Sequence, residues 1–459
     1  MSAIVSASSP SVSSVSSSTV SSFQVLLLAW PIMVSKLTYT AIAVVDTLVV
    51  SELGTAALAG VGLAVPAGHL ALSFGVSLAR ALQVVTAQAL GAGRPVAALA
   101  WHAVWLAGLI GVPTAVIAAL GGPFFVLLTG DVAIAAQASA AFSGRVLGAP
   151  LVILSMGLAA WFQGRGDTRT PMVGMLGAAA LNVVLDPLLV LGIGPWAGLG
   201  LFGTGLAFVM GQAAAALWLS VQAWRQVRHA PRNLDPSLLS EVGRIGVPNA
   251  VNAILSVGAF LVFAAMVSRS GEAELAAHVL VLRISSVSFL PGDAVGEATG
   301  VMVGHAVGSA NAERARQSFA AGLRLGVGIM SAWALLFVVM PGAMLTIFQP
   351  APEVAAVAGP LLLIAAAFQV FDAVAMVSHG ALDGAGDARF LMVVEVLSAW
   401  LVKLPLGAWL TLGLDGGAAG AWGGLTIEIV VVAALLLART RGERWLVRIA
   451  TPEPERAAV

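Results

Sequence analysis

The chain consists mainly of long apolar runs separated by short groups of charged or turn-forming residues. A helix needs about 20 apolar residues to cross the roughly 30 Å hydrocarbon core of a bilayer. Twelve runs reach this length, so we expect twelve membrane-spanning helices. The second and eighth are the longest and contain Pro66 and Pro291, which predicts bent helices that extend beyond the hydrocarbon. The predicted spans are 23–48, 55–90, 96–120, 132–160, 170–191, 199–226, 242–267, 273–307, 314–339, 353–382, 388–411 and 417–438.

Composition supports an all-α integral membrane protein. Of 459 residues, 59% are hydrophobic and 10% are charged, whereas soluble domains carry about 25% charged residues. The formal net charge is zero, so no nucleic-acid partner is expected. The chain has no cysteine, no His-Glu-x-x-His motif and no Gly-x-x-x-x-Gly-Lys loop. These absences argue against thiolate chemistry, a zinc site and direct use of ATP, and we expect no cofactor.

The basic residues indicate how the chain is oriented in the membrane. Fourteen of the 22 Lys and Arg residues lie in connections after even-numbered spans or in the C-terminal tail, and one, Arg269, lies in an odd-numbered connection. Basic loops remain in the cytoplasm, so both termini are predicted to be cytoplasmic. Residues 1–22 contain twelve Ser and no charged side chain, and they lack the basic start of a signal peptide. We expect a monomeric protein that crosses the cytoplasmic membrane many times.

The second half of the chain repeats landmarks of the first half. Pro31 and Pro248 are 217 residues apart, as are the segments 88–91 (Gln-Ala-Leu-Gly) and 305–308 (His-Ala-Val-Gly). Each copy has six spans, an even number, so both share one orientation about an axis along the membrane normal. The predicted divisions are a disordered tail (1–22), an N-lobe (23–227), a cytoplasmic linker (228–241), a C-lobe (242–441) and a cytoplasmic C-terminal tail (442–459).

Several short motifs follow one another in a specific order along both halves. They are Pro31 with Val45-Asp46-Thr47, the segment 52–59 (Glu-Leu-Gly-Thr-Ala-Ala-Leu-Ala), the segment 163–169 (Gln-Gly-Arg-Gly-Asp-Thr-Arg), Asn182 with Asp186-Pro187, and Phe371-Asp372-Ala373 before the segment 384–387 (Gly-Ala-Gly-Asp). In order and spacing, the chain resembles the multidrug and toxic compound extrusion (MATE) transporters. The resemblance implies an antiporter, not an enzyme, that exports amphipathic, often cationic organic compounds by alternating access, coupled to H⁺ or Na⁺.

Within that family, the acidic residues resemble the branch named for a DNA-damage-inducible protein. Asp46 and Asp186 match the two carboxylates of that branch's N-lobe coupling site, and Asn182 and Thr204 match their polar partners. Asn182 lies one turn before Asp186 on the same helix face. Two neighbouring buried carboxyl groups can hold a proton near neutral pH, and the four side chains also offer oxygen ligands to Na⁺. The alternative is that these acids pair with Lys36 or cap helix kinks.

The C-lobe has a second candidate acidic site. Asp293 and Glu297 share one helical face, and Asp372 matches the tenth-helix carboxylate of another branch of the family. Charged residues within spans are expensive and require a reason. The alternative reason is structural ion pairing, in which Lys403 neutralises Glu395 or Glu428.

Tyr39, Met172, Met175 and Trp161 are the candidate substrate-pocket residues, because thioethers and flat rings adapt to varied apolar cations. The alternative is that they pack in the core or at the membrane interface. Arg145, within the fourth span, is expected to bond carbonyl groups or reach the cytoplasmic interface.

The sequence is also compatible with other functions. The same scaffold is shared by flippases and exporters of lipid-linked precursors or polysaccharide, and a membrane scaffold or receptor is a further alternative. The Gly-x-Gly-Asp motif also occurs in intramembrane aspartyl proteases. Here, however, both copies end helices on the cytoplasmic side, where we expect Asp167 and Asp387 to pair with the neighbouring Arg169 and Arg389.

Overall fold

The structure is a computed structural model that describes residues 19–442 and 444–446. Most of both predicted tails therefore lies outside the described residues. The described first half contains α1 (Ser22–Ser51), α2 (Thr55–Gly91), α3 (Leu99–Leu106), α4 (Val112–Val116), α5 (Gly121–Thr129), α6 (Val132–Val146), α7 (Ala149–Gly164), α8 (Arg169–Leu191) and α9 (Leu201–Val227). The second half contains α10 (Pro236–Ser268), α11 (Glu272–Gly308), α12 (Ala312–Val339), α13 (Pro341–Thr346), α14 (Pro352–Gly384), α15 (Ala388–Ser398), α16 (Leu404–Ala408) and α17 (Gly417–Arg441).

The number of spans agrees with the sequence. Eleven helices in the described chain are long and apolar enough to cross a membrane, and α6 with α7 makes a twelfth span that bends by 46°. The third span runs from Leu99 to Thr129, nine residues beyond its predicted end at 120. It includes a π-helical segment, Ala107–Gly111, which ends two residues before Pro113. Proline has no N–H to donate, and the local change in helix type accommodates the missing hydrogen bond.

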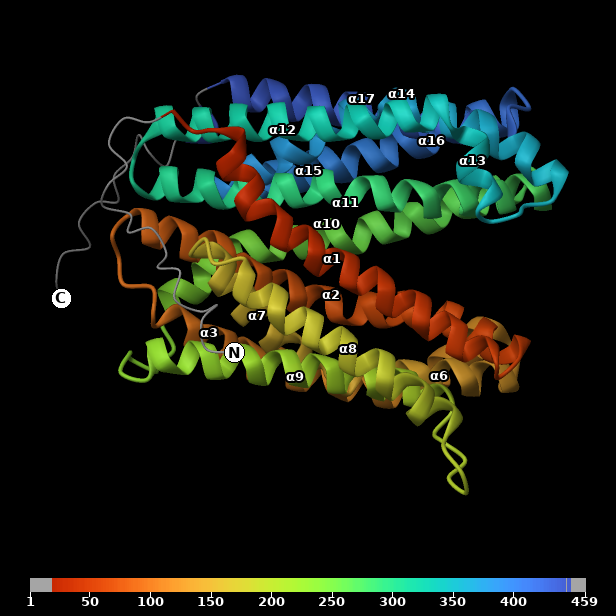
Figure 1. Ribbon diagram of the computed structural model, residues 1–459, viewed down its shortest axis with the longest axis horizontal. Coiled ribbons are helices and arrows are strands. Elements are labelled where there is room, and N and C mark those ends of the chain that lie inside the picture. The colour runs from red at the N-terminus through yellow and green to blue at the C-terminus, as the bar shows by residue number, and fades with distance from the viewer. Residues whose placement is uncertain (1–18, 443, 447–459) are drawn as a thin grey trace.

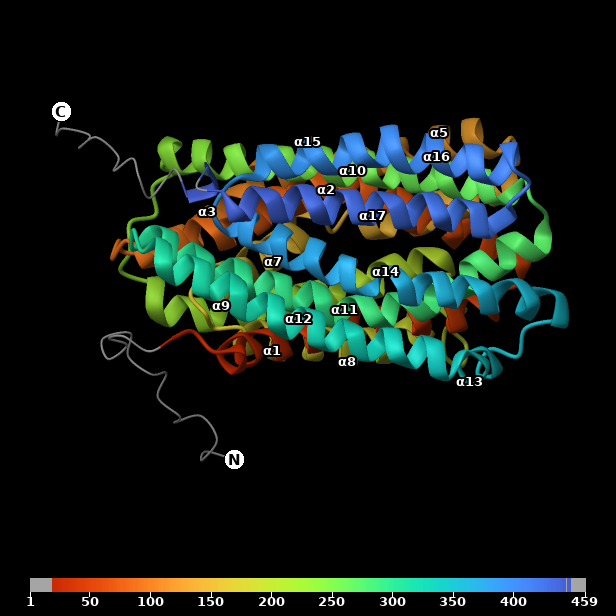
Figure 2. The ribbon, with the colours of Figure 1, turned by 90° about the horizontal axis from the view of Figure 1, so that it is seen from above.

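The helices form two lobes that lie side by side (Figure 1). One lobe contains α2, α3 and α6–α9, and the other contains α11, α12 and α14–α17. Seen from above, the helices of both lobes run along the long axis of the molecule (Figure 2). This is the two-lobe, all-α architecture that the internal repeat predicts.

Helix α1 crosses from one lobe to the other (Figure 1). Its first half packs against the C-lobe, where Val25, Ala29 and Ile32 join a buried cluster with residues of α11 and α12. Its second half packs along α8 in the N-lobe. A single helix therefore connects the interior of both lobes.

Helix α10 makes the reciprocal crossing. Val242 and Ile245, near its start, belong to the buried core of the N-lobe. A Cβ atom on Gly246 would lie 2.8 Å from the backbone of Leu78 in α2, so only glycine allows this approach. The beginning of α10 at Pro236 also extends helix into the segment predicted as a linker. The predicted domain boundaries therefore stay a prediction. In the structure, α1 and α10 each pack against both lobes.

The lobes meet closely at the end of the bundle where α2 and α11 finish. A Cβ atom on Gly91 would lie 2.1 Å from the carbonyl oxygen of His305, and one on Gly308 would lie 2.0 Å from that of Gln88. Gln88 Nε2 donates to the Gly384 carbonyl at 2.8 Å. His305 Nε2 lies 2.7 Å from the Gly164 carbonyl. We call this set of contacts the interlobe seal.

The seal follows the internal repeat. Gln88 and His305 are 217 residues apart, as are Gly91 and Gly308, and Gly164 and Gly384 are 220 apart. Each half of the chain therefore contributes one side-chain hydrogen bond to a carbonyl group of the other half. The reciprocal geometry is what a two-fold relation between the lobes requires.

Candidate functional site

The two predicted acidic residues of the N-lobe meet in its interior. Asp46 on α1 is 6% exposed and Asp186 on α8 is fully buried. The two carboxyl groups are close enough to interact electrostatically. Two neighbouring carboxylates repel each other unless a positive charge compensates them. Binding of one positive charge would therefore change the interactions of both side chains.

Local sequence explains this placement. Pro187 lies inside α8 directly after Asp186 and has no N–H for the helical ladder. On α9, a Cβ atom on Gly203 would lie 2.5 Å from the Leu189 carbonyl oxygen, so glycine lets α9 approach α8 closely. Thr204, the next residue, is 4% exposed and donates its hydroxyl to the Leu201 carbonyl. Three helices therefore contribute polar atoms to one small region.

Several atoms of this region have no conventional partner. Among the described residues, no N–H or O–H group donates to Asp46 Oδ1, to either oxygen of Asp186 or to Asn182 Oδ1. The Asn182 amide nitrogen also lacks a partner. Buried polar atoms are almost always satisfied in proteins, and an unsatisfied group calls for an explanation. These unsatisfied atoms make the region a candidate site for a small cation.

Among the ion pairs of the described residues, one joins a basic side chain to this acidic pair, and that side chain is Arg145. Its Nη2 lies 3.4 Å from Asp46 Oδ2, and both side chains are 8% exposed. Its guanidinium also lies over the Phe208 ring, 4.3 Å from the ring centroid. The expectation that Arg145 bonds carbonyl groups or reaches the interface is therefore wrong, because a buried carboxylate offers the stronger partner.

An apolar cavity of about 440 Å³ lies between α1, α2, α7 and α8, and Phe208, which packs on Arg145, is part of its lining. Tyr39 and Met175, two of the predicted pocket residues, line it together with Met156 and Phe208. Met172 is not among its lining residues. Trp161 lies in the core, where its indole N–H donates to the Val96 carbonyl at 2.8 Å. Trp161 is likewise not among the lining residues of this cavity, and its place in the pocket stays a prediction.

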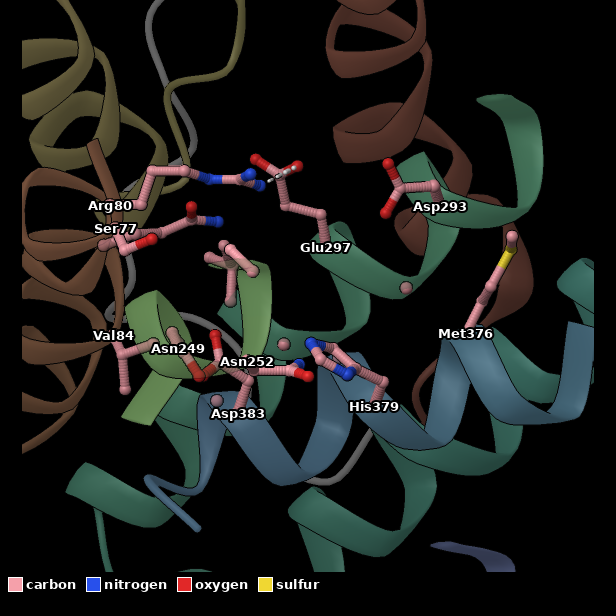
Figure 3. A pocket seen from close by; sticks show the side chains of 17 residues that line it. Ser77, Arg80, Val84, Asn249, Asn252, Asp293, Glu297, Met376, His379 and Asp383 are labelled. Atoms are coloured by element: carbon pink, nitrogen blue, oxygen red, sulfur yellow. Dashed lines mark hydrogen bonds and ion pairs between the residues drawn. The ribbon is translucent and has the colours of Figure 1, made fainter. Parts of the chain in front are cut away.

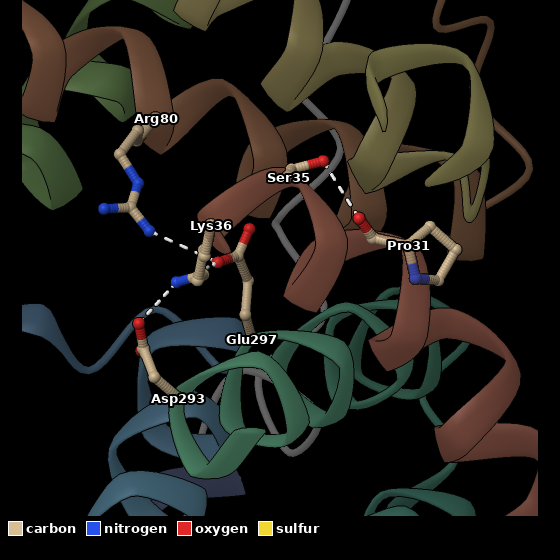
Figure 4. A network of polar contacts seen from close by, with 6 residues as sticks. All are labelled: Pro31, Ser35, Lys36, Arg80, Asp293 and Glu297. Carbon is tan, nitrogen blue, oxygen red and sulfur yellow. Dashed lines mark hydrogen bonds and ion pairs between the residues drawn. The ribbon is translucent and has the colours of Figure 1, made fainter. Parts of the chain in front are cut away.

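A charged network joins the two lobes at the edge of this cavity (Figure 4). Lys36 on α1 lies 2.5 Å from Asp293 and 2.9 Å from Glu297, both on α11. Arg80 on α2 lies 3.4 Å from Glu297. Lys36 therefore pairs with the C-lobe acids, and the alternative that it neutralises Asp46 or Asp186 is not what the structure shows. In the same region of α1, the Ser35 hydroxyl donates to the Pro31 carbonyl at 2.9 Å, a contact that tends to bend helices.

Polar and charged side chains line a cavity on the C-lobe side of this network (Figure 3). One cavity of about 260 Å³ is lined by residues such as Arg80, Asn249, Asp293, His379 and Asp383. A second, of about 330 Å³, is lined by Asp293, Asp372, His379, Glu395, Lys403 and Glu428. The predicted residues Asp293, Glu297 and Asp372 thus border connected polar space, but Glu297 is held by Lys36 and Arg80.

His379 supplies the partner that sequence reasoning assigned to Lys403. His379 Nδ1 lies 2.5 Å from Glu395 Oε1, and the Asn252 amide donates to the other carboxylate oxygen. The residues are 16 positions apart on different helices, α14 and α15. The sequence carried no spacing signal for this pair.

The two Gly-x-Gly-Asp motifs are structural, although not with the predicted partners. Asp167 accepts from the backbone and hydroxyl of Thr170 at the start of α8. Asp387 pairs with Arg439 of α17 at 2.8 Å. The neighbouring Arg169 and Arg389 are therefore not these partners, because Asp167 is used at the start of α8 and Asp387 reaches across to α17. Gly166 and Gly386, with φ of +82° and +81°, make the turns.

The repeated lobes, the twelve spans and the buried acidic pair define a polytopic membrane transporter rather than an enzyme. The MatE family pattern matches residues 31–188 and 248–409, and the chain belongs to this family. The probable multidrug resistance protein NorM of Pseudomonas putida is 31% identical over 435 residues, covering 92% of this chain and 93% of that protein. The multidrug resistance protein MdtK of Pectobacterium atrosepticum is 27% identical, covering 90% and 94%.

Solved structures support the fold. A MATE structure in complex with MaL6 has a TM-score of 0.86 and 19% identity, covering 94% of this chain and 97% of that chain. A structure described as the outward-facing conformation of a multidrug resistance MATE family transporter has a TM-score of 0.84 and 19% identity, with the same coverage. The assignment to the DNA-damage-inducible branch stays a prediction.

Proposed function

We propose that the protein is a cation-coupled antiporter of the cytoplasmic membrane that exports amphipathic, often cationic organic compounds. The relatives named above are described as multidrug resistance proteins. The apolar cavity, with Tyr39, Met156 and Met175 in its lining, suits varied hydrophobic ligands. Asp46 and Asp186 bind the coupling cation, H⁺ or Na⁺, with Asn182 and Thr204 as polar partners.

The observation that carries this proposal is the position of Asp46, one member of the acidic pair, on α1. Asp46 lies on the part of α1 that packs in the N-lobe, and Lys36, ten residues earlier, is ion-paired to the C-lobe. A change of charge at Asp46 therefore acts on the same helix that joins the lobes. Pro31 gives this helix a point at which it can bend.

We infer that the interlobe seal marks the closed cytoplasmic end, so that the cavity opens outward. In this state the pair takes up a cation, α1 shifts, and the exported compound leaves. The basic connections predicted to be cytoplasmic adjoin the sealed end. Export requires that cation and drug disfavour each other's binding, with a coupling of about 5- to 150-fold in affinity.

Drug affinity in detergent, measured at several pH and sodium values, tests this function. We expect the affinity to fall at least about fivefold as the pair becomes occupied by its cation. An affinity that is indifferent to both ions would end the antiport proposal. Flux in liposomes under imposed ion gradients then shows whether coupling drives transport.

The substitution Asp46→Asn tests the assigned cation site. It leaves the positive charge of Arg145 to balance the negative charge of Asp186, so the protein should still fold. Efflux should nevertheless fall to about 1% or less, because the remaining charges balance without a cation. Glu353→Gln, at the exposed start of α14, is the control and should transport normally. Normal drug resistance in cells that express Asp46→Asn would contradict the assigned site.

A further inference from the structure

Arg145 occupies a place that the surrounding helices are shaped to provide. A Cβ atom on Gly205 of α9 would lie 2.4 Å from the Arg145 backbone nitrogen, and one on Gly68 of α2 would lie 3.2 Å from its Cδ. The guanidinium packs on the Phe208 ring. Glycines on two helices and an aromatic ring on one of them therefore fix this side chain against Asp46.

The charge of the buried group follows from its members. Two ionised carboxylates and one guanidinium carry a net charge of −1, and one added proton brings the group to zero. A second proton would leave it at +1. Uncompensated buried charge is costly, so the neutral group with a single monovalent cation is favoured. Without the arginine, the same two carboxylates would need two positive charges.

We propose that Arg145 is a positioning residue that makes the N-lobe site take up one proton per cycle and reject sodium. This inference rests on the proposed antiport function. It assigns the coupling ion and the stoichiometry, which the acidic residues alone leave open.

Geometry favours the proton over the metal ion. A proton forms a covalent O–H on one of the two carboxyl groups, and this O–H can donate to an oxygen of a neighbouring group. A sodium ion would have to bind beside a guanidinium that already lies 3.4 Å from Asp46 Oδ2. The fixed positive charge repels a metal ion there, whereas a proton placed on Asp186 lies on the far carboxyl group.

Other titratable groups near Arg145 are few. His69 on α2 and Tyr39 on α1 both interact electrostatically with the guanidinium, and the contacts that α9 makes at this site come from Thr204 and Phe208. His69 Nδ1 lies 3.1 Å from the Val65 carbonyl. A pH response that originates at the acidic pair should therefore persist in His69→Gln. Its loss in that variant would assign the response to the imidazole and overturn the inference.

The first experiment uses the unmodified protein. In weakly buffered detergent solution, a pH dye should report about one proton released for each drug molecule bound, and sodium should change the drug affinity less than about twofold. In liposomes, a pH gradient should drive transport and a sodium gradient at constant pH should not. Two protons per drug, or sodium-driven transport, would overturn the inference and leave cation coupling intact. Indifference to both gradients would contradict the proposed function as well.

The second experiment changes the arginine. In Arg145→Gln, about 100 mM sodium should lower drug affinity about tenfold, because the uncompensated pair now accepts a metal ion. Arg145→Lys keeps the charge and should remain indifferent to sodium. Arg283→Gln, an exposed arginine on α11, is the matched control. If Arg145→Gln is as indifferent to sodium as the control, the inference fails. If this variant does not fold, the proton count of the unmodified protein still decides.

Discussion

The two lobes share a backbone plan but differ in how they hold their acids. In the N-lobe, Asp46 and Asp186 are sealed among α1, α6 and α8, with one arginine as their fixed partner. In the C-lobe, Asp372 and Glu395 border polar cavities that also contain His379 and Lys403. A duplicated scaffold has thus kept its glycines, prolines and reciprocal contacts while its two interiors acquired different chemistry.

This difference has a physical meaning. The interactions of a buried carboxyl group change strongly when a cation binds, because neither solvent nor another side chain compensates for the change in its charge. A carboxyl group beside several exchangeable partners changes them little. We therefore expect the N-lobe acids to couple cation binding to transport. We expect the C-lobe acids to affect how much water the cavity holds and which ligand charges it accepts.

The strongest test of this contrast removes one acid from each lobe. Asp186→Asn should abolish drug efflux, to about 1% or less, since the remaining Asp46 and Arg145 form a neutral pair with no need for a cation. Asp372→Asn should reduce efflux less than about fivefold, because other charged groups border the same space. Transport rates in liposomes measure both. Equal losses in the two variants would remove the proposed division between the lobes.

The next test acts on the interlobe seal at equivalent positions of the repeat. Gly91→Ala and Gly308→Ala each place a methyl group against a carbonyl oxygen of the other lobe. The resulting overlap costs about 1–3 kcal/mol in a packed contact, and transport should fall about tenfold or more as the sealed state is lost. Labelling of the cavity from the cytoplasmic side should rise. Gly62→Ala, in the same helix as Gly91 with open space around it, should have no effect.

A smaller effect is expected in the charged network between the lobes. Glu297→Gln leaves Lys36 and Arg80 without their shared carboxylate, whose side chain is 11% exposed. The sealed state should lose about 1 kcal/mol, which is roughly a fivefold change in the ratio of the two states. The more exposed Asp293, at 55%, should matter less when changed to Asn. Double electron–electron resonance between spin labels on the two lobes measures the ratio, and a larger effect of Asp293→Asn would reverse this order.

The smallest expected effect concerns the paired hydrogen bonds of the seal. Gln88→Ala and His305→Ala should each weaken it by about 1 kcal/mol, a typical net value for one hydrogen bond. His305→Gln should be closest to the unmodified protein, because glutamine already makes the equivalent contact at position 88. Transport rates in the three variants check the order. A loss in His305→Gln as large as in His305→Ala would show that imidazole chemistry, rather than the hydrogen bond, matters there.

Much of the fold could be predicted from the sequence because membrane burial leaves a strong pattern. The length of apolar runs determines the spans, and six spans per repeat determine the relative orientation of the halves. The end of the third span was missed, since residues 121–129 look like a connection but continue the helix as α5. The crossing of α1 into the C-lobe leaves no mark in hydropathy, because both of its halves are equally apolar.

The candidate site was predicted less completely. Asp46 and Asp186 stand out because charged residues in a span are rare, and Asn182 follows from helical spacing. Arg145 was misplaced because a long side chain can reach several helices, and the sequence alone does not say which. The pairing of His379 with Glu395 depends on how α14 and α15 lie together. Such pairs depend on tertiary packing, which residue spacing along one helix does not predict.

The lengths of α2 and α11 bear on how easily the transporter reopens. Each has 37 residues, which at 1.5 Å per residue is about 55 Å, well beyond the roughly 30 Å of hydrocarbon. We therefore expect the terminal turns that carry Gly91 and Gly308 to lie in the lipid headgroup layer. When these turns separate, headgroups and interfacial water can solvate the freed carbonyl and amide groups at once. When the lobes separate there, no unpaired backbone group is exposed to the hydrocarbon. The contacts can therefore open and close repeatedly at low energetic cost.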